Sequence, residues 1–317
     1  MSYAQRLASA EEIAKYNFLA ALGPLRKYLE DDAVYNVNIN EDGRIFVEHA
    51  QIGTFEALET MSLPDREALI GNLANREQRS IDRLNSRLQC DMPYFNVRCQ
   101  AFAPPISTWS LMLRKHAVRV FTLCDYVEKS QMTTAQRWQV EQAVSRHENI
   151  FVVGGMNSGK STALNAVLHE CARRYPSDRL LVVQDRKELQ PTHRNVVYLM
   201  TVKEQAYHEG GTVHRWEYSW LHALEDMLRT SSDAYVFGEL REYKSAVGLV
   251  MAANTGASGI MATMHANSAE EAPERLEDML AAAGVSVPTR MAKRLLNTVI
   301  EMGFVEGKRV VKKVLNY

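Results

Sequence analysis

Apolar residues recur at every second position in one early part of the chain. Val34–Ile39 shows this alternation, Asp42-Gly43 follows, and Arg44–Glu48 takes the alternation up again. A period of two places successive side chains on opposite faces of a strand, and Asp-Gly is a preferred two-residue hairpin turn. The pattern therefore predicts a β-hairpin.

Other patterns before residue 118 mix helices with strands. The predicted helices are Glu11–Leu29, with a break at Gly23-Pro24, and Pro64–Ile81; the further predicted strands are Asn96–Phe102 and Trp109–Arg114. Such a mixture predicts a smaller α+β domain at residues 1–117. We expect a polar connector at residues 118–134, in which Thr133 and Thr134 can cap the next helix.

From residue 149 onward the pattern becomes an alternation of strands and helices. The strands predicted from apolar runs are Ile150–Val153, Arg179–Gln184, Asn195–Met200, Ala234–Gly238 and Ile260–Met264, with a terminal hairpin of Thr298–Phe304 and Arg309–Leu315. Continuous apolar strands that alternate with helices are typical of a mainly parallel sheet covered on both faces. Residues 135–317 are therefore expected to form an α/β domain.

The most informative motif follows the strand predicted at Ile150–Val153. Eight residues fit G-x-x-x-x-G-K-[ST], the pattern of a phosphate-binding loop: Gly154, Gly155, Met156, Asn157, Ser158, Gly159, Lys160 and Ser161, with Thr162 directly after them. Apolar residues with helical spacing come directly after it: Leu164, Val167, Leu168 and Cys171. Strand, glycine loop and helix form the context that this motif requires.

Each part of the loop has a physical reason. The glycines at 154 and 159 let the backbone approach phosphate closely, and successive N–H groups at a helix start face the anion. Lys160 places a positive charge on the outer phosphates, and Ser161 offers a hydroxyl to Mg²⁺. The sequence therefore predicts a site for a nucleoside triphosphate and Mg²⁺.

Three downstream segments end in polar residues where a predicted strand stops. Glu239 ends an apolar strand, and such a carboxylate can hold metal through water or polarise the attacking water. Asp185 and Glu188 follow another strand and are candidates for positioning water, although an ordinary charged loop explains their spacing equally well. His265 follows a third strand, where its imidazole can donate to phosphate. A single histidine there is more often structural.

Composition narrows the class of protein. The 317 residues are 46% hydrophobic and 24% charged with a net charge of −1, so there is no overall electrostatic attraction for nucleic acid. Two basic runs, at 114–119 and 308–313, are more typical of solvated faces. No apolar stretch is long enough to span a bilayer. The cysteines form no C-x-x-C pair, which argues against a structural zinc site. We expect a cytoplasmic protein.

In their order, the four segments resemble the type II and type IV secretion (traffic) ATPases. The phosphate loop is followed by an aspartate box, then by Gly238-Glu239-Leu240-Arg241 as the Walker B strand, and then by a histidine box. Within that superfamily the chain is most similar to the TrbB-type conjugal transfer ATPases, over nearly its whole length. The segments that carry this resemblance before the phosphate loop are Leu22–Arg26, Asp42-Gly43, Val97-Arg98, Pro104-Pro105, Leu113–Lys115 and Leu123–Val127.

The resemblance implies a fold and a set of roles. The fold is a RecA-like P-loop ATPase domain after the N-terminal domain, assembled as a hexameric ring. Carried over by match, Lys160 and Ser161 bind phosphate and Mg²⁺, and Glu239 is the principal Walker B carboxylate, beside Gly238 and Arg241. Glu188 is the general base of an aspartate box that includes Asp185, and His265 senses the γ-phosphate. Arg98 and Arg114 of the N-terminal domain bring positive charge onto the nucleotide. Arginine suits the last task because its fork spans two phosphate oxygens.

The chain departs from the family pattern at four positions. Met156 and Asn157 stand where family members usually carry Thr-Gly, Gln184 stands where the aspartate box usually has Glu, and Ala257 replaces a first histidine. We expect nucleotide binding to survive these changes and the rate of hydrolysis to be more sensitive to them.

The leading hypothesis is therefore a hexameric, Mg²⁺-dependent ATPase that converts ATP hydrolysis into domain motion. It would power a type IV secretion or conjugal transfer system from the cytoplasmic side of the bacterial inner membrane, bound to inner-membrane components and beside a coupling ATPase, without touching nucleic acid. A type IV pilus or type II secretion motor is an alternative within the superfamily. An ATP-gated docking scaffold with little hydrolysis is an alternative of another class, and a DNA translocase would need a basic channel.

Overall fold

The computed structural model describes residues 3–49, 51–115, 120–209, 212–227, 229–241, 243–254 and 259–317. The chain divides into two compact units, Met1–Val118 and Arg119–Tyr317, and each has hydrophobic core clusters of its own. The boundary that we predicted at residue 117 and the position of Ala257 lie outside the described residues.

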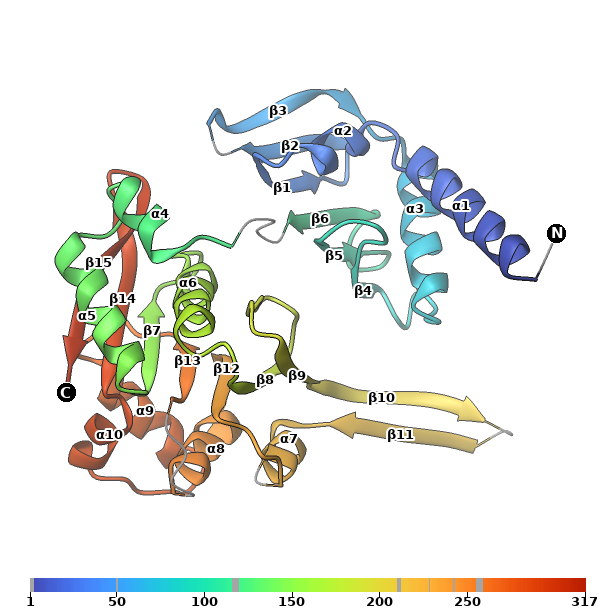
Figure 1. Ribbon diagram of the computed structural model, residues 1–317. Coiled ribbons are helices and arrows are strands. Elements are labelled where there is room, and N and C mark those ends of the chain that lie inside the picture. The colour runs from blue at the N-terminus through green and yellow to red at the C-terminus, as the bar shows by residue number, and fades with distance from the viewer. Residues whose placement is uncertain are drawn as a thin grey trace. The chain divides into compact units, whose positions relative to one another are not determined.

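The first unit is built on an antiparallel sheet of order β3-β2-β1-β6-β5-β4. Its strands are β1 Val34–Ile39, β2 Arg44–His49, β3 Gly53–Thr60, β4 Arg87–Asp91, β5 Val97–Phe102 and β6 Ser110–Lys115, and its helices are α1 Tyr3–Ala21, α2 Leu25–Glu30 and α3 Leu63–Arg76 (Figure 1). Alternate strand residues such as Val37, Cys99 and Leu113 are buried with the helices in one core cluster. The alternating, half-exposed residues lie on the other face of the sheet.

Most elements predicted in this unit are confirmed. The hairpin of β1 and β2 forms, and the helix breaks at Gly23-Pro24 into α1 and α2. The helix that we predicted as far as Ile81 is wrong at its end, because α3 stops at Arg76. Strands β3 and β4 were not predicted. Each has few buried residues and lies at an edge of the sheet, so its apolar pattern is weak.

The second unit contains a seven-stranded sheet of order β15-β14-β7-β13-β12-β8-β9. The strands are β7 Ile150–Gly154, β8 Arg179–Gln184, β9 Asn195–Met200, β12 Ala234–Leu240, β13 Met261–Met264, β14 Thr298–Val305 and β15 Lys308–Asn316. All neighbouring pairs are parallel except β14 and β15. The sheet is therefore mainly parallel with one antiparallel edge strand.

Helices cover both faces of this sheet. They are α4 Leu123–Glu128, α5 Thr134–Ser145 and α6 Lys160–Arg174 on one face, and α7 Trp220–Met227, α8 Tyr243–Asn254, α9 Ala272–Ala281 and α10 Thr289–Leu295 on the other (Figure 1). Alternate residues of β7 separate the two layers: Val152 packs in the core of the first face, and Phe151 and Val153 pack in that of the second. The predicted fold class, a RecA-like α/β domain after a smaller α+β domain, is confirmed.

Three details of this unit differ from the predictions. Residues 195–200 form the strand β9, but Tyr198 and Met200 are more than a third exposed because β9 is an edge strand. Helix α4, begun by a capping box at Thr122, lies within the predicted connector. A separate two-stranded sheet, β10 Val202–Glu209 and β11 Thr212–Tyr218, was not predicted. Thr133 does cap α5, as expected.

No helix in the described part of the chain combines the length and the apolar character that crossing a membrane requires.

Candidate nucleotide site

Four parallel strands deliver the predicted site residues to one edge of the second sheet. Strands β7, β13, β12 and β8 are consecutive neighbours, so their carboxyl ends lie side by side. Ligands of open α/β sheets bind at this edge because loops and helix starts converge there. The edge brings together the phosphate loop, the segment 185–188, Glu239 and His265.

The phosphate loop has the backbone that its sequence predicts. Gly159 has a φ of 93° and is the N-cap of α6, and Asn157 has a φ of 57°, so the chain turns sharply into the helix. At Gly154 an added Cβ would strike the carbonyl oxygen of Met302 on the neighbouring strand β14. Only glycine fits at Gly154, so the loop is held close against the sheet.

Lys160 lies across this loop and is only 7% exposed. Its ammonium donates to the carbonyl oxygens of Gly154 at 3.1 Å and Gly155 at 2.8 Å. The same Nζ lies 3.4 Å from Nδ1 of His265. Lys160 thus links the loop to the end of β13.

A chain of charged groups continues from His265. Its Nε2 lies 2.7 Å from a carboxylate oxygen of Glu239, and Glu239 also pairs with Arg241. Arg241 in turn lies 3.7 Å from the carboxylate of Asp185. The four predicted segments are therefore joined through side chains: loop lysine, histidine, Walker B glutamate and aspartate box.

Burial lowers the pKa of His265 below its ordinary value, and the adjacent Lys160 ammonium lowers it further, while Glu239 acts in the opposite direction. A neutral imidazole fits the geometry, with Nδ1 accepting from Lys160 and the Nε2 hydrogen directed at Glu239.

Glu188 belongs to a second branch of the site. Its carboxylate accepts a hydrogen bond of 2.9 Å from the Ser161 hydroxyl, and its backbone carbonyl accepts from Asn165. The buried amide oxygen of Gln184 accepts from the backbone N–H groups of Glu188 and Leu189, both at 3.1 Å. Gln184 therefore holds the turn that aims Glu188 at Ser161.

Gly238 allows the strands beneath the site to pack closely. A Cβ at this position would lie 2.8 Å from the Cβ of Gln184 on the adjacent strand. On its other side, the hydroxyl of Thr263 donates to the Gly238 carbonyl at 2.7 Å. The glycine before Glu239 is thus required by packing and not by an unusual φ.

Arg309 is a neighbour of the phosphate loop that the sequence did not reveal. It is the second residue of the last strand, β15, and its Nε donates to the carbonyl of Asn157 at 2.9 Å. A Cβ on Gly159 would lie 3.2 Å from the Cδ of Arg309. Its basic run at 308–313 was interpreted as a solvated face. Because Arg309 and Asn157 are far apart in the chain, no local sequence pattern predicts their contact.

Arg98 and Arg114 lie in the first unit and are direct partners in the register of β5 and β6. Both are on the face of the sheet that alternates with the buried residues Cys99 and Leu113. Two guanidinium groups therefore stand side by side on that sheet.

The side chains at the loop fit a Mg²⁺–triphosphate. Mg²⁺ prefers oxygen ligands and is usually held by one or two side chains together with substrate phosphates. The Ser161 hydroxyl and the carboxylates of Glu188 and Glu239 supply such oxygens beside the phosphate loop. Among the described residues no cluster of three His, Cys, Asp or Glu would hold a metal by itself.

The family model described as type II/IV secretion system protein matches residues 66–309, so the chain belongs to that family. It is 34% identical over 256 residues to a probable conjugal transfer protein TrbB of Sinorhizobium fredii, covering 80% of this chain and 74% of the relative. It is 30% identical over 289 residues to the conjugal transfer protein TrbB of Rhizobium radiobacter, covering 91% of this chain and 85% of the relative. The resemblance seen in the sequence is confirmed.

A solved structure of the pilus retraction motor PilT with bound ADP has the same fold, with a TM-score of 0.63 and 17% identity over 93% of this chain and 82% of that one.

Proposed function

We propose that this protein is a hexameric, Mg²⁺-dependent ATPase that converts ATP hydrolysis into domain motion and so powers a bacterial type IV secretion or conjugal transfer system. The observation that carries the proposal is the continuous contact from Lys160 through His265 and Glu239 to Arg241 and Asp185 at the end of a phosphate loop. The relatives named as conjugal transfer proteins support the choice of system.

In this proposal the loop binds the triphosphate. The backbone N–H groups of residues 154–159 and the start of α6 face the phosphates, and Lys160 exchanges its loop carbonyl acceptors for phosphate oxygens. The Ser161 hydroxyl would help to hold Mg²⁺, which when bound would neutralise charge on the phosphate oxygens.

The surrounding groups carry out the hydrolysis. Glu239 polarises the attacking water or holds Mg²⁺ through water, and Glu188 accepts the proton of the attacking water as general base. His265 senses the γ-phosphate: a phosphate that attracts Lys160 removes the cation from Nδ1 of the imidazole. Arg241 and Asp185 hold the Glu239 carboxylate in place.

Motion follows from differential contacts of the first unit. Arg98 and Arg114 gain phosphate oxygens when the domains close and lose them when the phosphate leaves, so the closed state is favoured only with ATP. We propose that six such chains form a ring, with the residues 118–134 acting as the linker between the domains. The ring would be peripheral to the cytoplasmic face of the inner membrane, bound to components of the secretion apparatus and beside a coupling ATPase.

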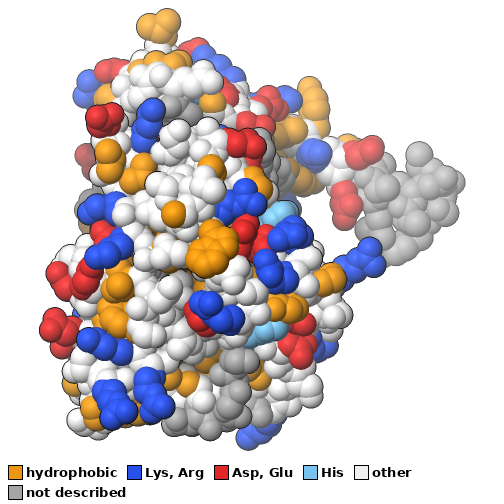
Figure 2. Space-filling view, turned by 60° about the vertical axis from the view of Figure 1, so that its left-hand side comes forward, with side chains coloured by type: hydrophobic (Ala, Val, Ile, Leu, Met, Phe, Trp, Pro, Cys, Tyr) orange, Lys and Arg blue, Asp and Glu red, His pale blue; other side chains and the backbone are white. Residues whose placement is uncertain are grey.

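Direct action on DNA is not part of the proposal. The net charge is −1, and on the face drawn in Figure 2 the Lys and Arg side chains lie among Asp and Glu side chains. A nucleic-acid channel requires a continuous basic surface.

Steady-state phosphate release by the purified oligomer tests the proposal, together with its mass with and without Mg²⁺ and an ATP analogue. We expect Mg²⁺-dependent turnover and a mass of six chains. ATP binding without turnover would favour the docking scaffold, an alternative that the neutral Gln184 in the aspartate box keeps open. Absence of ATP binding would contradict both.

A further inference from the structure

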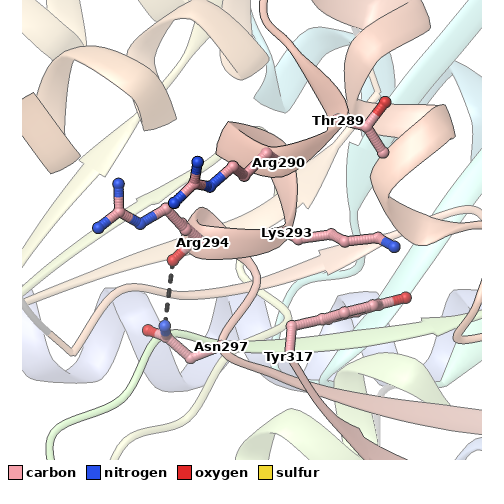
Figure 3. A pocket seen from close by; sticks show the side chains of 6 residues that line it. All are labelled: Thr289, Arg290, Lys293, Arg294, Asn297 and Tyr317. Atoms are coloured by element: carbon pink, nitrogen blue, oxygen red, sulfur yellow. Dashed lines mark hydrogen bonds between the residues drawn. The ribbon is translucent and has the colours of Figure 1, made fainter.

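A second charged region lies in the same unit, around helix α10. A hollow of about 460 Å³ is lined by Thr289, Arg290, Lys293, Arg294, Asn297 and Tyr317. In Figure 3 the Arg290 and Arg294 guanidinium groups extend to the same side, while Lys293 extends the other way above the Tyr317 ring, 5.6 Å from its centroid. The hollow is strongly cationic.

This hollow is separate from the nucleotide site. Asn297 accepts a 3.0 Å hydrogen bond from the backbone N–H of Asn149, the residue immediately before β7. The phosphate loop follows the other end of β7, at Gly154. Tyr317 likewise follows β15, whereas Arg309, at the start of β15, contacts the phosphate loop. The two regions therefore lie at opposite edges of the sheet.

The three cations of the hollow have no counter-charge among the residues that the structure describes. In the described part of the chain Arg290, Lys293 and Arg294 make no ion pair, and no acidic side chain lines the hollow. Arg290 and Arg294 are four residues apart on one helix, a spacing at which like charges repel. Arg290 also lies in the first turn of α10, where the helix dipole disfavours a cation. Lys293 and Arg294 lie in the last turn, where the dipole favours cations, so the unfavourable contributions are the placement of Arg290 and its repulsion with Arg294.

We propose that this hollow is a docking site for an acidic segment of a partner protein, whose carboxylates pair with Arg290 and Arg294. Guanidinium groups form planar, two-point hydrogen bonds with carboxylates, so two adjacent arginines recognise two acidic residues of an extended chain. Charge complementarity favours this occupant. Small-molecule sites bury most of their ligand, whereas these cations are exposed.

A titration of the full-length protein tests the proposal. The probe is a fluorescein-labelled peptide of ten glutamates, with ten glutamines as the control peptide, followed by fluorescence anisotropy at low salt. We expect binding of the glutamate peptide, a loss of affinity of about tenfold or more in Arg290→Ala/Arg294→Ala, and an intermediate loss in Arg290→Lys/Arg294→Lys, which keeps the charge but not the fork.

The matched control is Arg26→Ala/Lys313→Ala, which removes two exposed cations that already pair with Glu30 and Glu270. Equal loss in this control would overturn the proposal in favour of diffuse charge attraction. So would binding to vesicles containing anionic lipid but not to the peptide, which would assign the surface to a membrane.

Thermal melting provides an independent readout. Because the arginines repel each other, the Arg290→Ala/Arg294→Ala variant should melt at or above the wild-type temperature. A clearly lower melting temperature would show that the pair stabilises the fold, and would count against a docking role. ATP turnover is expected to stay at the wild-type rate, so a failure of this proposal leaves the proposed ATPase function untouched.

Discussion

The two edges of the second sheet treat charge in opposite ways. At the carboxyl edge Lys160, His265, Glu239 and Arg241 each contact a neighbour of opposite or complementary character. At the other edge three cations of α10 lie together with no counter-ion among the described residues. The paired groups at the carboxyl edge hold one another in position for catalysis. The cations of α10, unpaired within the described part of the chain, are free to bind a negatively charged partner.

The difference also decides what a substitution costs. Removing one member of the network leaves a partly buried partner without its hydrogen bond, and such a loss lowers the free energy of unfolding most. Removing an exposed arginine of α10 leaves no such partner. The predictions below follow this contrast from the largest expected effect to the smallest.

Lys160→Ala should have the largest effect. It removes the ammonium that faces the phosphates, and we expect phosphate release to fall by about 10³-fold or to become undetectable. The control Lys313→Ala removes a lysine of an exposed ion pair and should change the rate by less than about twofold. Wild-type turnover in Lys160→Ala would remove the phosphate loop from the mechanism.

Glu239→Gln should separate binding from turnover. The amide keeps the size of the side chain and an oxygen acceptor for His265, but it loses the charge that orients water and metal. We expect ATP to bind, measured with a fluorescent analogue, while turnover falls by about 10²-fold. If both measurements matched the wild type, Glu239 would have no catalytic role.

Gly238→Ala tests the packing beneath the network. The new methyl group would meet the Gln184 side chain at 2.8 Å, so we expect the free energy of unfolding in urea to fall by about 1–3 kcal/mol. Gly71→Ala in α3 is the control, because its Cβ has open space and should be neutral or stabilising. A Gly238→Ala protein as stable as the wild type would show that the strands can separate locally.

Arg309→Ala should weaken the phosphate loop without removing any group that touches the reacting atoms. The lost hydrogen bond to Asn157 is expected to raise the KM for ATP about fivefold and to change kcat less. Lys308→Ala, next to it in the same hairpin, should leave both constants unchanged. An equal effect of the two substitutions would indicate a general role of the hairpin.

The smallest effect concerns pH. Because the pKa of folded His265 is lowered, the unfolded chain binds more protons than the folded one below the ordinary histidine pKa of about 6.5. Relative to His265→Gln, the wild-type free energy of unfolding should therefore fall as the pH drops from 7.5 to 5.5. Urea titrations at both values measure it. A rise instead would mean that Glu239 dominates the environment of the imidazole.

Local patterns were sufficient for the elements that bury either one clear face or both faces. The β1–β2 hairpin was predicted from its alternating pattern and the strand β7 from its continuous apolar run, and both signals are clear over a few residues. Strands β3, β4 and β9 lie at sheet edges and have few buried positions. The apolar patterns of β3 and β4 were therefore too weak to predict a strand, and β9 was predicted to be more buried than it is. Helix α4 is too short to show a helical period.

The sequence by itself determined that this chain carries a phosphate loop and three strand-end polar segments in a fixed order, because those motifs depend on neighbouring residues. The tertiary structure decided which side chains meet: His265 beside Glu239, Arg309 on the phosphate loop, and Lys293 over the ring of Tyr317. Such contacts join residues far apart in the chain or on different elements. They depend on strand order and register, and neither is written in local spacing.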